Sequence, residues 1–137
     1  MKLRREKINE KDVGLAEDGF EMLIHAVGEE SHCKWNYNMT KKKEELNKWI
    51  ESRELRSELM KLIVDLFGVD LKNQSWCQLK HTLREAIGVE EVMNRINKDQ
   101  DKIKELEKFA DIHNQLYLRY LSILGVNEKN AKVLSEA

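Results

Sequence analysis

Two groups of histidine, cysteine and acidic residues in this chain have spacings that could hold a metal ion. The first group recurs at intervals of three and four residues, so its side chains share one face of a helix. It consists of Asp18, Glu21, His25, Glu29 and His32. Glu29-x-x-His32 has the form in which carboxylate-bridged di-iron bundles supply ligands. The group lies opposite the apolar stripe of its own segment, and no second Glu-x-x-His follows later in the chain. We therefore expect a solvated acidic face here and no metal site.

The second group combines His32 and Cys33 with Cys77 and His81. Cys77 and His81 are one helical turn apart, and zinc favours sets of cysteine and histidine ligands. However, adjacent residues such as His32 and Cys33 form an awkward chelate, and Cys77 and His81 lie opposite the apolar residues around them. We expect two free thiols, no metal and no cofactor.

The segment from residue 29 to residue 39 is the least regular part of the pattern and the richest in versatile side chains. Its candidates for lining a pocket or an interface are His32, Cys33, Trp35 and Tyr37. Large aromatic residues in a polar segment either complete a small core or anchor a partner. We therefore expect this segment to contribute to an interaction surface or a pocket.

His113 interrupts an apolar helical face and stands one turn before Tyr117. A histidine in such a position needs partners for its ring nitrogens, and both residues are candidates for an interaction site or pocket. The chain has no Gly-rich phosphate loop, nucleophile elbow or His-Glu-x-x-His motif, which removes several enzyme classes that can be identified from sequence. An enzyme, metal-dependent or other, that uses His32, Cys33 and His113 is kept as a third interpretation.

The stretch from residue 117 to residue 134 has apolar residues at set spacings around a glycine. Tyr120, Leu124, Val126, Ala131 and Leu134 are the apolar positions, and Gly125 is the turn. The pattern resembles the helix-turn-helix of DNA-binding proteins, with Leu121 where a small residue is usual. This resemblance implies that Lys129, Asn130 and Lys132 would contact nucleic acid. A nucleic-acid-binding regulator is therefore the second interpretation.

Glycines mark the predicted ends of the helices that position these residues. Gly68, Gly88 and Gly125 each precede Val and then an acidic or amide residue, and Gly28 is a looser case. Glycine after a helix takes the left-handed conformation without a Cβ penalty, and an apolar residue then packs back on the last turn. We therefore predict helices over residues 10–27, 40–66, 73–87, 90–124 and 128–134. Thr40 is the predicted cap of the second helix, which we expect to be bent or continuous near residues 51–54, and the polar residues 97–101 offer an alternative split of the long segment.

Composition supports an all-α fold. The chain has 137 residues, no proline and 36% charged residues, with a net charge of −1. Average proline usage would give about seven, so its absence favours uninterrupted helices. The sequence predicts a flexible N-terminus over residues 1–9 and a single helical domain over residues 10–137. This domain would be a bundle of five or six helices with a long helix in the C-terminal half.

The predicted core draws on most of these helices. It consists of Phe20, Leu23, Trp49, Leu59, Leu62, Leu66, Trp76, Leu83, Ile103, Leu106 and Tyr117. No apolar run is long enough to span a membrane, the N-terminus lacks the apolar stretch of a signal peptide, and two distant cysteines do not form a disulfide framework. We expect a soluble, cytoplasmic protein.

The favoured function is a non-enzymatic helical protein–protein interaction or regulatory module. In the long C-terminal segment, apolar residues alternate at spacings of four and three, which is typical of a coiled-coil seam. Such a helix exceeds what a small bundle can cover. We expect a protein partner or a second copy, with a homodimer formed through part of this helix.

Overall fold

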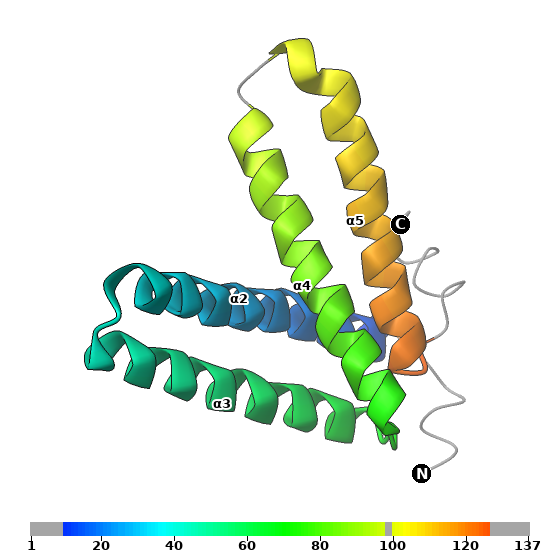
Figure 1. The fold of residues 1–137 in the computed structure, drawn as a ribbon. Coiled ribbons are helices and arrows are strands. Elements are labelled where there is room, and N and C mark those ends of the chain that lie inside the picture. Colours follow the sequence, from blue (N-terminus) through cyan, green and yellow to red (C-terminus); the bar gives the residue numbers. More distant parts are fainter. Residues whose placement is uncertain (1–9, 98–99, 127–137) are drawn as a thin grey trace.

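The computed structural model describes residues 10–97 and 100–126, and within these ranges it contains no strand. Its elements are α2 (Glu10–Thr40), α3 (Lys43–Leu66), α4 (Asn73–Ile96), the short 3-10 helix η1 (Gln100–Lys102) and α5 (Ile103–Ile123) (Figure 1). The predicted all-α class is confirmed. The predicted count of five or six helices is wrong, because the described residues form four α-helices. The N-terminus over residues 1–9 and the predicted helix over 128–134 lie outside the described residues.

Only two of the four glycines that were predicted to follow a helix do so. Gly68 and Gly125 have φ values of 64° and 78°, as predicted for the residue after a helix. Gly28 and Gly88 lie inside α2 and α4, which continue to Thr40 and Ile96. At Gly28 the reason is packing, since a Cβ there would lie 3.1 Å from Ile87 Cγ1. The prediction that residues 29–39 are irregular is therefore wrong.

The turn between α2 and α3 is formed by Lys41 and Lys42. Lys41 adopts a left-handed φ of 56°, which turns the chain back without a glycine. Thr40 does not cap α3, because Lys42 occupies the N-cap position. Instead, the Thr40 hydroxyl donates a hydrogen bond to the Asn36 carbonyl at 2.9 Å. Helix α3 then runs without a break through residues 51–54, as expected.

The helices form two antiparallel hairpins, α2–α3 and α4–α5, which meet where α4 crosses α2 (Figure 1). Away from this crossing the hairpins diverge and their tips point in different directions. The long C-terminal segment is split, because α4 ends at Ile96 and α5 begins at Ile103. The predicted seam therefore continues on α5, while its first part belongs to the distal half of α4.

The core lies at the crossing and draws side chains from all four helices. Three residues of the predicted core, Phe20, Leu23 and Leu83, are buried. Leu62, Leu66 and Ile103 are exposed instead. Helix α3 packs mainly on α2, so the side of α3 that faces away from α2 is left uncovered. The other members of the predicted core are only partly buried: Trp49, Leu59, Trp76, Leu106 and Tyr117.

Tyr120 is the largest fully buried side chain. Its ring lies 5.0 Å from that of Phe20, and its hydroxyl donates a hydrogen bond to the Ala16 carbonyl at 2.9 Å. Burial, followed by the nearby Tyr117, raises the pKa of Tyr120, so the hydroxyl stays protonated and available as a donor. This residue joins the end of α5 to the start of α2.

Candidate functional site

A buried ion pair holds the α2–α3 hairpin together near the crossing. Arg56 of α3 donates two hydrogen bonds to Glu30 of α2, from Nε at 2.9 Å and from Nη2 at 3.1 Å. Arg84 of α4 adds a third charge, with Nη2 at 3.9 Å from Glu30 Oε2. The forked geometry matches the planar guanidinium to the carboxylate. The pair therefore fixes the register of α2 against α3 and faces α4.

The charge of Glu30 is maintained despite its burial. Desolvation raises the pKa of Glu30, but the hydrogen bonds and charge of Arg56, with smaller contributions from Lys80 and Arg84, outweigh it. The net result is a pKa below the ordinary value. Glu30 is ionised near neutral pH, so this group is a structural ion pair and not a proton donor.

Elsewhere on α2, three helices bring acidic groups and histidines together. One carboxylate oxygen each from Glu21 and Glu90 and a ring nitrogen of His25 all lie within 4.8 Å of one another. Glu21 and His25 are exposed residues of α2, while Glu90 is a half-buried residue of α4. The predicted solvated face is confirmed in that Asp18, Glu21, His25, Glu29 and His32 are all exposed. The contact with Glu90 was not predicted.

His113 of α5 contacts this group at Glu90. Its Nε2 lies 3.4 Å from Glu90 Oε2. This nitrogen is buried and has no hydrogen-bond partner, so the two atoms are close without the alignment of a hydrogen bond. We define Glu21, His25, Glu90 and His113 as the junction cluster.

A shallow pocket of about 200 Å³ opens beside the junction cluster between α2 and α5. Glu21, His113 and Tyr117 are among its lining residues, together with Phe20. The ring of Phe20 contacts both His113 and Tyr117 edge-on, at 5.8 and 5.1 Å. Burial and then the charge of Glu17 raise the pKa of Tyr117 to about 12, so its hydroxyl is neutral at ordinary pH. His113 and Tyr117, two of the predicted site residues, therefore share this pocket.

The other predicted site residues lie elsewhere on α2. His32 is exposed, with Nε2 at 3.5 Å from Glu91 of α4, and Cys33 is a half-buried free thiol. Neither residue lines the pocket of His113. Trp35 is 59% exposed, whereas Tyr37 packs against Trp49 at 6.0 Å. His32, Cys33 and His113, the residues of the enzyme interpretation, therefore do not share this pocket.

The four residues that the sequence offered as a possible zinc site are also separated. Cys77 and His81 are exposed near the start of α4, where they line an open groove with Glu85 and Arg119. His32 contacts Glu91, and at 1.5 Å per helical residue Glu91 lies about 21 Å along α4 from Cys77. Cys33 and Cys77 are both free, as expected. Lys129, Asn130 and Lys132 of the nucleic-acid interpretation lie outside the described residues.

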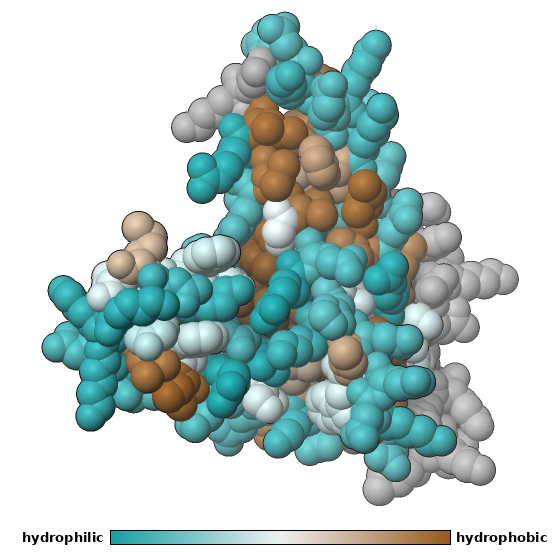
Figure 2. Space-filling view, viewed as in Figure 1, coloured by the Kyte–Doolittle hydropathy of each residue, from teal (hydrophilic) through white to brown (hydrophobic). Residues whose placement is uncertain are grey.

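The distal half of the α4–α5 hairpin carries a patch of apolar side chains that no other described helix covers. Figure 2 shows it as a band along the hairpin beyond the crossing. On α4, residues 89, 92 and 96 share one face, and on α5, residues 109 and 112 do so. Val92 and Ile112 are 41% and 44% exposed. Val89 packs against the core at the border of this face, and we call the other four residues the distal patch: Val92, Ile96, Phe109 and Ile112.

The chain matches no protein-family model, no curated protein and no solved structure. Among residues 10–97 and 100–126, no helix combines the length and apolar character needed to cross a bilayer.

Proposed function

We propose that this protein is a non-enzymatic helical interaction module that forms a homodimer through the distal patch. The observation that carries the proposal is the exposure of Val92 and Ile112 on a hairpin that stands clear of the rest of the molecule. A two-helix hairpin buries only the seam between its helices, and a second hairpin is the simplest cover for the remaining apolar face. Two copies related by a two-fold axis would together form a four-helix arrangement.

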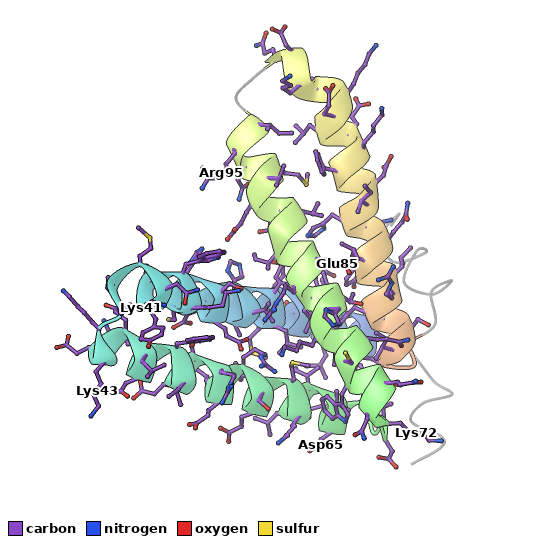
Figure 3. The ribbon with its side chains drawn as sticks, viewed as in Figure 1. Lys41, Lys43, Asp65, Lys72, Glu85 and Arg95 are labelled. Carbon is purple, nitrogen blue, oxygen red and sulfur yellow. The ribbon has the colours of Figure 1, made fainter. Side chains whose placement is uncertain are left out.

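The charges beside the distal patch suit a second copy. Arg95 follows Val92 by three residues on α4, and Glu105 precedes Phe109 by four residues on α5, so helical spacing places both next to the patch. Arg95 projects outward near the distal end of α4 (Figure 3). In a two-fold interface each residue meets its counterpart reciprocally, so Arg95 of one copy can pair with Glu105 of the other.

Sedimentation equilibrium of the wild-type chain and of two lysine variants tests the proposal. Val92→Lys combined with Ile112→Lys places charges in the patch and should shift the protein to monomer. Leu62→Lys is the matched control, because Leu62 is 54% exposed but lies on α3. It should leave the dimer unchanged. A wild-type monomer at all concentrations refutes self-association, and a dimer broken only by Leu62→Lys refutes the distal patch as its site.

A charge exchange gives a second, independent readout. Arg95→Glu and Glu105→Arg should each weaken the dimer, while the double variant should restore it. Both substitutions also reverse favourable charges at helix ends, which costs roughly 0.3–1 kcal/mol each. That cost remains in the double variant, so recovery of the dimer reports pairing across the interface. Weakening that is merely additive would contradict the pairing.

A further inference from the structure

We propose that the junction cluster binds one divalent transition-metal ion, with Zn²⁺ as the fitting probe, and that this ion ties the two hairpins together. The ligands would be Glu21 and His25 from α2, Glu90 from α4 and His113 from α5. This inference concerns residues outside the distal patch and goes beyond the proposed interaction function.

The first argument is the chemistry of the converging atoms. Carboxylate oxygens only accept hydrogen bonds, and each neutral imidazole presents one lone pair. Glu21, Glu90 and His25 bring such atoms within 4.8 Å of one another. His113 directs a buried nitrogen without a hydrogen-bond partner toward Glu90. A cation placed between these acceptors would be stabilised by all of them.

The second argument is geometric. Ligand atoms around tetrahedral zinc are about 3.3 Å apart when the bonds are 2.0–2.1 Å long. The 3.4 Å separation of His113 Nε2 and Glu90 Oε2 already has this value. The Glu21, His25 and Glu90 atoms lie within 4.8 Å of one another, so their separations exceed the tetrahedral value by at most about 1.5 Å. Glu21 and His25 are exposed, so their side chains can rotate to close this gap.

The ligand types also select the class of ion. Imidazole nitrogens suit zinc and its transition-metal neighbours, whereas magnesium and calcium prefer oxygen alone. Four protein ligands would complete the coordination of zinc, which is typical of structural sites and not of catalytic ones. Because the ligands belong to both hairpins, a bound ion would set the angle between them.

The experiment uses the full untagged chain after treatment with a chelator, titrated with Zn²⁺ by calorimetry and with Co²⁺ by visible absorption. We expect one equivalent of Zn²⁺ to bind and Co²⁺ to give the intense bands of tetrahedral coordination. His25→Ala and His113→Gln should each lower the affinity for Zn²⁺ at least tenfold. Even substitution of the hydrogen-bond partners of metal ligands typically lowers metal affinity about 10–100-fold. The other two histidines are matched controls, and His32→Ala and His81→Ala should bind like wild type.

Circular dichroism of each metal-free variant checks that the helices are retained. If His113→Gln does not fold, Glu90→Gln decides, because Glu90 is only half-buried and the amide keeps its size. Three results would overturn the proposal. They are no binding by the wild type, equal losses in the control variants, and full affinity in the folded site variants. The last two would place the metal elsewhere, and the first would leave the cluster without a bound ion.

Discussion

Glu30 and Arg56 form a buried ion pair, and loss of either partner should destabilise the fold strongly. Breaking a buried ion pair from one side leaves an uncompensated charge, so we predict that Arg56→Met lowers the free energy of unfolding by about 3 kcal/mol. Urea denaturation measures the change. The double variant Glu30→Leu with Arg56→Met should regain much of it, because no charge remains buried. Arg119→Ala is the control, since its pair with Glu85 is exposed and should contribute almost nothing.

The same pair predicts a dependence of stability on pH. The pKa of Glu30 in the folded protein lies below its ordinary value of 4.5. The unfolded chain therefore binds the proton more readily, and the contribution of the pair is complete above that value. It is lost as the pH falls through the folded pKa. Denaturation at about pH 7 and about pH 3 should show a larger loss for the wild type than for the Glu30→Leu, Arg56→Met double variant; equal losses would contradict the assignment.

Helix α2 contains two glycines, Gly19 and Gly14, whose surroundings differ. A Cβ at Gly19 would lie 3.0 Å from both Ile63 Cδ1 and the Tyr120 hydroxyl, which is held by its bond to Ala16. We predict that Gly19→Ala destabilises the protein by about 1 kcal/mol, since overpacking outweighs the gain in helix propensity.

Gly14 is the control for this prediction, because nothing lies within 4 Å of its Cβ position. Gly14→Ala should stabilise the protein by roughly 0.5–1 kcal/mol through helix propensity alone. Thermal unfolding of the two variants checks the opposite signs. A stabilising Gly19→Ala would mean that Tyr120 can move aside and that the contact between α2 and α5 is looser than described.

The helix boundaries show which part of the fold can be predicted from local sequence. Gly68 and Gly125 end helices, but Gly28 and Gly88, in nearly the same local sequence, do not. The difference at Gly28 is tertiary, because Ile87 of another helix needs the space. A glycine that ends a helix and a glycine that admits a neighbour are therefore indistinguishable from local pattern alone.

The same limit explains what was missed in the site. Once α2 is extended past Gly28, Glu30 falls three residues after Val27 on the buried face, and this is the one signal that could have found it. Glu90 had no such signal, because its role depends on where α4 crosses α2. His113 was recognised from its place in an apolar face, which periodicity does report.

The two hairpins of the molecule share one core and diverge beyond it (Figure 1). The distal patch and the junction cluster share no residue, so self-association and metal binding can be measured separately. We predict that the dimer-disrupting pair Val92→Lys and Ile112→Lys leaves the affinity for Zn²⁺ unchanged, by the same calorimetric titration. A loss of both properties together would show that the distal part of the hairpin and the crossing are coupled.

The hydrogen bond from Tyr120 to Ala16 spans 104 residues of sequence. Each hairpin, by contrast, closes through a short turn, at a small cost in chain entropy. Folding should therefore begin with the two hairpins as separate local units, and the contact between α5 and the start of α2 should form last. The first and last described helices would then part first when the native protein opens, leaving both hairpins briefly intact.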